Sequence, residues 1–216
     1  MKQINIQYIP ALEGITAGDQ LAELITKLVM PERINQVNWP DAFPAKPQTE
    51  FYIARSDKAL YIHFIAQEKQ IKAIYSQDQD PVWQDSCVEF FCKIPGNENY
   101  FNFEFNCIGT CLSTERRKRN EHVMPISPKQ MALIQRYPSL GTKTFAEKQG
   151  NFTWSLTVVI PFEILKLEID NLPDTITANF YKCGDGTSVP HYLSWNPIKI
   201  EKPDFHRPDF FGKLKF

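Results

Sequence analysis

Two neighbouring segments of this sequence alternate polar and apolar residues so regularly that they dictate a β-hairpin. The segments are Cys87 to Ile94 and Tyr100 to Cys107, and turn-forming residues 95–99 join them. Because successive side chains of a strand point to opposite faces of its sheet, the alternation separates a core face from an outer face. The core face of the second segment is aromatic and consists of Phe101, Phe103 and Phe105.

Short strands with turn residues between them follow one another along most of the chain. Beyond the hairpin, strands are predicted at residues 49–54, 59–67, 132–137, 152–160, 176–182 and 212–216. Helices do not alternate with these strands, which argues against a parallel α/β fold. The pattern is typical of an all-β protein, and we expect an antiparallel β-sandwich of jelly-roll type.

A single short helix is predicted near the N-terminus. Its apolar residues recur at helical spacing and form one stripe, made of Leu21, Leu24, Ile25 and Leu28. Asp19 is expected to cap the first turn, and Pro31 to close the helix. A chain of 216 residues suits one domain. We therefore expect residues 1–216 to form a single β-sandwich domain, with residues 1–38 as a helical or irregular segment packed on it.

The charge balance of the chain argues against partners that bind through bulk charge. Its 24 Lys and Arg residues against 25 Asp and Glu residues leave a net charge of −1, so we expect no nucleic-acid partner and no membrane partner. No stretch approaches the roughly 18 uninterrupted apolar residues of a membrane span. The first residues lack the apolar region of a secretory signal, so a native start at Met1 predicts a cytoplasmic protein with reduced cysteines.

The outer face of the predicted sheet carries amide, carboxylate and phenol groups. Its members, assigned by the same alternation, are Glu89, Asn102, Glu104, Asn106, Asn179 and Tyr181. Planar amides and carboxylates suit the paired donors and acceptors that the vicinal hydroxyls of a sugar present. The alternative is a hydrated sheet face whose composition has no function.

Two of the four tryptophans lie in predicted loops, where an indole face is available to a ligand. Trp83 lies in a polar loop before the hairpin, and Trp195 precedes Pro197. The large apolar face of an indole packs well on the C–H groups of a sugar ring. Trp83 is the better ligand candidate, whereas Trp195 could equally be a core residue. Trp39 and Trp154 are expected in the core.

Six stretches in a fixed order resemble the carbohydrate-binding module family 9-like domains, which are relatives of xylan- and cellulose-binding modules. The most distinctive runs from Val82 to Phe91 and contains Trp83-Gln84-Asp85-Ser86-Cys87-Val88-Glu89. The others are residues 59–64, 100–106, 179–185, 191–195 and 203–214. Together they extend from about Trp39 to the C-terminus.

This resemblance implies a calcium-stabilised β-sandwich that grips a sugar between two aromatic rings. By similarity, Trp83 supplies one ring and Glu89 holds hydroxyls. The second ring would come from Trp195, Phe205 or His206. The modules carry an arginine where this sequence has Glu104. We therefore expect non-catalytic carbohydrate binding, in carbohydrate catabolism, with a mono- or oligosaccharide as partner.

Two other functions fit parts of the same pattern. Glu89 and Glu104 lie on like faces of one hairpin, and a pair of carboxylates is what a glycoside hydrolase uses as acid and as base or nucleophile. An interaction protein could also keep the fold without binding any glycan. Release of a reducing sugar would identify the hydrolase, and the lack of any glycan binding would identify the interaction protein.

Acidic residues in turns offer hard oxygen ligands for a cation. They are Asp78, Asp80 and Asp85 before the hairpin and Asp185 in a glycine turn. Oxygen ligands of this kind favour structural Ca²⁺ over zinc. The alternative is that these aspartates are ordinary solvated turn residues, since acids are common there.

Overall fold

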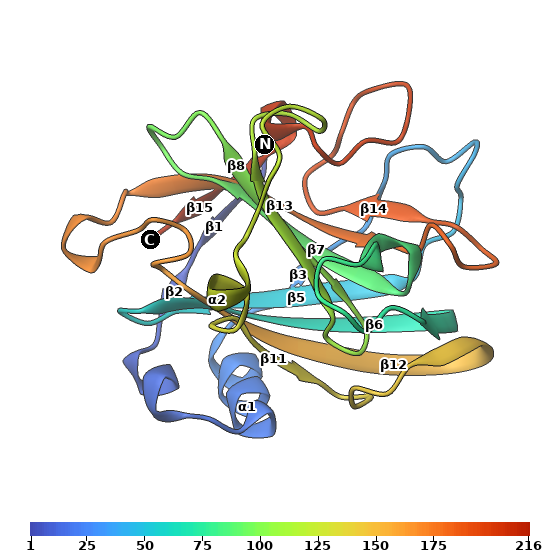
Figure 1. The fold of residues 1–216 in the computed structure, drawn as a ribbon, viewed down its shortest axis with the longest axis horizontal. Coiled ribbons are helices and arrows are strands. Elements are labelled where there is room, and N and C mark those ends of the chain that lie inside the picture. Colours follow the sequence, from blue (N-terminus) through green and yellow to red (C-terminus); the bar gives the residue numbers. More distant parts are fainter.

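The computed structural model describes all 216 residues, and its strands form two sheets packed face to face (Figure 1). The larger sheet has the order β1-β15-β13-β7-β8-β9-β10, and β14 joins β13 and β4 beside it. Its strands are Gln3–Asn5 (β1), Gly212–Lys215 (β15), Thr175–Cys183 (β13), Cys87–Lys93 (β7), Tyr100–Asn106 (β8), Cys111–Arg116 (β9), Met124–Pro125 (β10), Tyr192–Ser194 (β14) and Gln36–Val37 (β4).

The smaller sheet has the order β11-β12-β6-β5-β2, with β3 also paired to β5. Its strands are Gln135–Pro138 (β11), Phe145–Pro161 (β12), Ala59–Ala73 (β6), Gln48–Arg55 (β5), Gln7–Tyr8 (β2) and Glu32–Arg33 (β3). All pairs are antiparallel except β1 with β15 and β2 with β5. The predicted β-sandwich is therefore confirmed.

The main core fills the space between the two sheets. The predicted inward residues Phe101, Phe103 and Phe105 are fully buried there. Across the sandwich, the ring of Phe51 stacks on that of Phe180 at 3.6 Å between centroids. Each such side chain contributes about 1.5–3 kcal/mol on burial, so the aromatic faces of β5, β8 and β13 hold the sheets together.

Helix α1 (Gly18–Leu28) and the short helix η1 (Pro10–Gly14) pack on the outside of the smaller sheet. Leu21 and Ile25 of the predicted stripe are buried against the outer-face residues Tyr52 and Tyr61, whereas Leu28 is 51% exposed. Ala17 rather than Asp19 occupies the N-cap position, and Asp19 lies in the first turn. The remaining helical elements are α2 (Pro128–Met131), η2 (Val82–Gln84), η3 (Ile169–Asn171) and η4 (Pro208–Phe210). No helix has the length and apolarity that a bilayer crossing needs.

The outer face of the larger sheet is covered rather than hydrated. Loop residues, among them Trp39, Ile198 and Phe205, pack over Phe91 and Tyr181 in a second apolar cluster. The predicted polar face therefore lies under these loops, and Asn102 and Glu104 are buried. Strand alternation predicts which residues share a face, but not what folds over that face, and this corrects the expectation of a solvated surface.

Two element boundaries differ from the prediction for physical reasons. Strand β9 (Cys111–Arg116) was not predicted, because polar residues lie on both of its faces and hide the alternation: Ser113 and Glu115 point inward, and Thr114 and Arg116 point outward. The strand predicted at residues 132–137 starts only at Gln135. The capping box of Ser127 and Gln130 starts α2 just before it, so helix-type hydrogen bonds use the residues up to 134.

A buried ion pair lies between the sheets, at the end of β13. Lys182 points inward, and its Nζ lies 2.9 Å from Oε2 of Glu68 and donates to the carbonyl of Cys183 at 2.8 Å. Both side chains are almost completely buried. His191 lies 2.9 Å from the same ammonium, and burial together with Lys182 lowers the pKa of His191 to about 3. His191 therefore adds no second positive charge, and Glu68 is the only carboxylate within 4.0 Å of the Lys182 ammonium.

Replacing Lys182 with methionine is expected to destabilise the protein by about 3–5 kcal/mol, because it leaves the Glu68 carboxylate buried without a counter-ion. The double replacement Glu68→Gln and Lys182→Met should recover much of that loss, since no unpaired charge remains. Urea unfolding of the three proteins measures both effects. A double variant as unstable as the single one would show that packing, rather than charge, is what Lys182 supplies.

Candidate functional site

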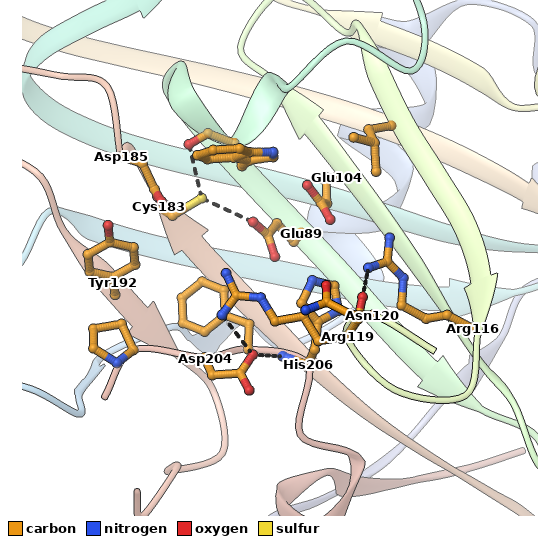
Figure 2. A pocket seen from close by; sticks show the side chains of 14 residues that line it. Glu89, Glu104, Arg116, Arg119, Asn120, Cys183, Asp185, Tyr192, Asp204 and His206 are labelled. Carbon is orange, nitrogen blue, oxygen red and sulfur yellow. Dashed lines mark hydrogen bonds and ion pairs between the residues drawn. The ribbon is translucent and has the colours of Figure 1, made fainter. Parts of the chain in front are cut away.

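A pocket of about 350 Å³ opens on the outer face of the larger sheet, where the covering loops leave a gap (Figure 2). Strands β7 and β8 contribute its floor, through Glu89 and Glu104. Its walls come from loops and strand ends, through Trp83, Asp185, Tyr192, Phe205, His206 and the arginines Arg116 and Arg119. The pocket thus joins segments that are more than a hundred residues apart in the sequence.

The two floor carboxylates are direct cross-strand neighbours. Glu89 pairs with Glu104 in the register of β7 and β8, and their exposed fractions are 3% and 4%. Oε1 of Glu89 accepts a hydrogen bond from the thiol of Cys183 at 3.0 Å. Oε1 of Glu104 accepts one from the side-chain amide of Asn102 at 2.9 Å, whereas its Oε2 is buried without a partner. An unsatisfied acceptor at the floor of a pocket is free to bind a ligand donor.

Burial shifts the acidity of the pocket. It raises the pKa of Glu89 well above its usual range, and the neighbouring Glu104 raises it further. Burial also raises the pKa of Glu104 to about 7, although Arg116 acts in the opposite direction. The pKa of Asp185 is raised to about 6, again mainly by burial. Near neutral pH the floor therefore holds at least part of its protons.

A chain of hydrogen bonds runs from the rim to the floor across β9 and β8. Nε of Arg116 donates to the hydroxyl of Thr114 at 2.7 Å, and that hydroxyl donates to Oδ1 of Asn102. The Asn102 amide then donates to Glu104. Asn102 is fully buried and does not line the pocket. It positions the Glu104 carboxylate rather than meeting a ligand itself.

Trp83 forms one wall and is the most accessible aromatic ring of the pocket. It lies in η2, its exposed fraction is 36%, and its carbonyl accepts a hydrogen bond from the amide of Asp185 at 3.1 Å. The turn at residues 184–186 approaches η2 so closely that a Cβ on Gly186 would lie 2.7 Å from the carbonyl oxygen of Gln84. Glycine at this position therefore lets the turn hold the indole beside Asp185.

The opposite wall comes from the C-terminal loop. Figure 2 shows His206 and Asp204 across the pocket from Asp185, with Glu89 between them. The ring of Phe205 stacks on Tyr181 at 4.2 Å, and the Tyr181 hydroxyl donates to the Phe205 carbonyl at 3.1 Å. Tyr181 is buried and thus supports the wall from below. The pocket therefore has the predicted Phe205 and His206 in the place of the second ring.

Trp195 does not reach the pocket, which corrects its expected role as an opposing wall. Its side chain is fully buried and lies edge-on against Phe180 at 5.8 Å. Its Nε1 donates to Glu32 at 2.9 Å. Trp195 follows β14 and points into the core between the two sheets. It is therefore a core residue, which was the alternative interpretation of the sequence.

Asn106 and Asn179 also lie outside the pocket and hold loops in place. The Asn106 amide donates to the carbonyl of Tyr75 at 2.8 Å and to Asp85 at 3.0 Å. Asn179 binds both the backbone N–H and the carbonyl of Asn196. Buried amides on a sheet face satisfy the backbone of the loops above them. Both residues are therefore structural in this fold, not ligand contacts.

Arg116 and Tyr192 line the pocket but were not predicted as site residues. Arg116 belongs to a basic run that resembles a solvated loop in the sequence. Alternation from Cys111 would place Arg116 on the same face as Thr114, had residues 111–116 been recognised as a strand. The resemblance implied an arginine where this chain has Glu104, and here Arg116 reaches the same pocket from the neighbouring strand β9.

The four aspartates proposed as calcium ligands do not gather into one site. Asp78 is paired with Arg136, and Asp80 accepts from the backbone N–H of Gln77 at 3.1 Å. Asp85 is buried and accepts from two backbone N–H groups, and Asp185 lines the pocket. None belongs to a group of three acidic, cysteine or histidine donors within metal-binding distance. The four aspartates therefore do not share one site.

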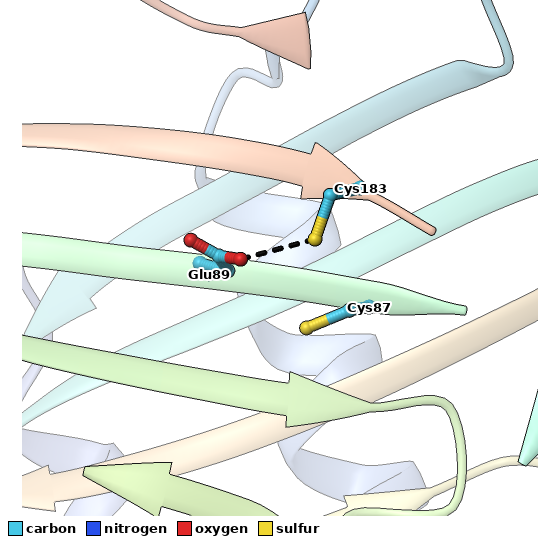
Figure 3. A group of neighbouring side chains, drawn as sticks. All are labelled: Cys87, Glu89 and Cys183. Atoms are coloured by element: carbon cyan, nitrogen blue, oxygen red, sulfur yellow. Dashed lines mark hydrogen bonds between the residues drawn. The ribbon is translucent and has the colours of Figure 1, made fainter. Parts of the chain in front are cut away.

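One cluster has donor atoms close enough for a metal, and two of its three members line the pocket. The ligand atoms of Cys87, Glu89 and Cys183 lie within 4.8 Å of one another (Figure 3). Two thiols and a carboxylate suit zinc or a softer ion rather than calcium. Burial raises the pKa of Cys87 to about 12 and that of Cys183 well above its usual value, so a metal would have to displace both thiol protons.

A two-sheet sandwich with an acidic, aromatic-walled pocket on one outer face defines a ligand-binding β-sandwich module. The family model of carbohydrate-binding family 9 matches residues 19–216. The chain therefore belongs to this family, and the resemblance drawn from its motifs is confirmed.

Solved structures agree with this assignment. A candidate carbohydrate-binding protein from Bacteroides uniformis ATCC 8492 is similar at 35% identity and a TM-score of 0.91, over 100% of this chain and 99% of that one. A family 9 carbohydrate-binding module from Caldicellulosiruptor kristjanssonii shares the fold at 13% identity. Its glucose complex has a TM-score of 0.56, over 99% of this chain and 95% of that one. Its cellotriose complex has a TM-score of 0.53, over 99% and 93%. No curated protein sequence matches this chain.

Replacing Glu104 with glutamine is expected to stabilise the protein in alkaline but not in acidic solution. The pKa of Glu104 is raised from 4.5 to about 7 in the native state, so its contribution to the unfolding free energy is lost as the pH rises through that interval. At about pH 8 the gain should be on the order of 2 kcal/mol, and at about pH 4 near zero. Thermal unfolding at both pH values measures it, and an equal effect at both would contradict a protonated Glu104.

Proposed function

We propose that this protein binds a saccharide in the pocket of the larger sheet and does not cleave it. The observation that carries the proposal is the pair Glu89 and Glu104 at the floor of a pocket beside the half-exposed indole of Trp83. Membership of carbohydrate-binding family 9 supports it. A retained saccharide would serve carbohydrate catabolism by staying available to separate enzymes.

The pocket offers contacts both for the C–H groups of a sugar ring and for its hydroxyls. The face of Trp83 offers apolar area for ring C–H groups, and Phe205 and His206 close the other side. Glu89 and the unpartnered Oε2 of Glu104 provide acceptors for hydroxyls. A volume of about 350 Å³ is at the small end of ligand pockets. This size favours one end of a chain or a short saccharide over a polymer lying across the sheet.

The same carboxylates are poorly set for hydrolysis. A glycosidase needs environments that push the two pKa values apart, so that one carboxyl is an acid while the other is ionised as base or nucleophile. Here burial raises the pKa of Glu89 and that of Glu104 alike. No lysine or arginine nitrogen lies within 4.0 Å of either group, and the more distant Arg116 offsets only part of the effect of burial on the pKa of Glu104. Binding therefore fits the floor better than cleavage.

Replacing Trp83 with alanine is expected to weaken saccharide binding by about 1 kcal/mol or more, roughly fivefold in Kd, because the stacking surface is lost. Isothermal titration of the full chain with glucose and short cello-oligosaccharides measures the effect. Tyr8, which is 43% exposed outside the pocket, supplies the control in Tyr8→Ala.

Three results separate the candidate functions. Saturable binding without release of reducing ends supports a binding module. Release of reducing ends that stops in Glu89→Gln or Glu104→Gln would support a hydrolase instead. A correctly folded protein that retains no glycan on an array of diverse saccharides would overturn the proposal and favour an interaction protein that keeps the fold.

A further inference from the structure

Three carboxylates of the pocket have no cationic partner. Glu89, Glu104 and Asp185 all line it, and no lysine or arginine nitrogen lies within 4.0 Å of any of them. Glu104 is 96% buried, as its exposed fraction of 4% shows, and its Oε2 has no hydrogen-bond partner of any kind. The pocket therefore holds three carboxyl groups without an ion pair, and Arg116 and Arg119 act on Glu104 only from beyond 4.0 Å.

The positive groups around the pocket are engaged elsewhere. Nε of Arg116 donates to Thr114 and its Nη1 to the carbonyl of Arg119 at 2.8 Å. Arg119 is paired with Asp204, at 3.6 Å between Nη1 and Oδ1. Lys182 lies on the other face of β13 and is paired with Glu68. Burial lowers the pKa of His206 to about 3, so its imidazole is neutral.

Buried carboxylates without counter-ions either take up protons or bind a cation. The raised pKa values of Glu89, Glu104 and Asp185 show the first response in the free protein. A ligand with an ammonium group would be the cation that these carboxylates bind, because it brings three N–H donors and a positive charge. The aromatic faces of Trp83, Tyr192 and Phe205 also favour a cation over a neutral group.

We propose that this pocket selects saccharides that carry a free amino group, with the ammonium held by Glu89, Glu104 and Asp185. The inference rests on the proposed saccharide binding and names its ligand class. The sugar ring lies against Trp83, and the ammonium meets the unpartnered oxygen of Glu104. N-acetylation of the amine removes the charge and two of the donors, so an N-acetylated sugar loses the advantage.

The test compares glucosamine, glucose and N-acetylglucosamine by isothermal titration of the full chain, with EDTA present so that no metal occupies Cys87 and Cys183. Glucosamine is expected to bind at least about tenfold more tightly than glucose, and N-acetylglucosamine no more tightly than glucose.

Asp185→Asn removes one carboxylate without changing the shape of the side chain. It should reduce the ratio of glucosamine to glucose affinity about tenfold, whereas Asp209→Asn, an exposed acid outside the pocket, should leave that ratio unchanged. The ratio is informative even where both affinities change, and circular dichroism confirms that each variant is folded.

The outcomes separate this inference from the proposed function. Glucose binding that equals or exceeds glucosamine binding would overturn the amino-sugar preference and leave saccharide binding intact. A folded protein that binds none of the three sugars at millimolar concentration would overturn the amino-sugar preference, and the array of diverse saccharides would then decide the proposed function separately. A preference for glucosamine that survives Asp185→Asn unchanged would contradict the assigned role of Asp185.

Discussion

The structure depends on the covering of one sheet face by distant loops. A sandwich buries its inner faces by construction, but here the outer face of the larger sheet is buried too, beneath residues such as Trp39, Phe205 and Phe211. This second burial takes Glu89 and Glu104 out of water and raises their pKa values. Where the covering is incomplete, it leaves the pocket. Both the acidity of the floor and the shape of the walls follow from the same packing.

The floor and the walls of the pocket have different physical origins. The floor is set by strand register, which pairs Glu89 with Glu104 and Asn102 with Thr114 across neighbouring strands. The walls come from η2, the turn after β13 and the C-terminal loop, which hydrogen bonds and ring stacking fix onto the sheet. The strands therefore present the paired carboxyl groups of Glu89 and Glu104, and the loops supply the aromatic rings together with Asp185.

Much of this arrangement could be predicted from the sequence, because alternation in β7, β8 and β13 assigns each residue to a face. The sequence placed Glu89 and Glu104 together, and the motif around Trp83 indicated the family. Coverage could not be predicted in the same way. Whether Asn106 meets solvent, a ligand or a loop depends on contacts made far along the chain, and the amide there binds Tyr75 and Asp85. The position of Trp195 could not be predicted for the same reason, because a local sequence pattern carries no information about which distant segments pack on a strand. Strand β9 was missed because its local pattern does not alternate.

Gly186 approaches the backbone of Gln84 so closely that the lack of a Cβ at this position sets the width of the pocket opening. A side chain at that position would meet a carbonyl oxygen that cannot rotate away, so the segment bearing Trp83 would have to tilt. A substitution at Gly186 would therefore change the angle of the indole. That angle sets the thickness of the ligand ring that fits between the two pocket walls, although Gly186 itself does not line the pocket. Relatives with a larger residue at this position should favour ligands of a different shape while keeping the same two carboxyl groups at the pocket floor.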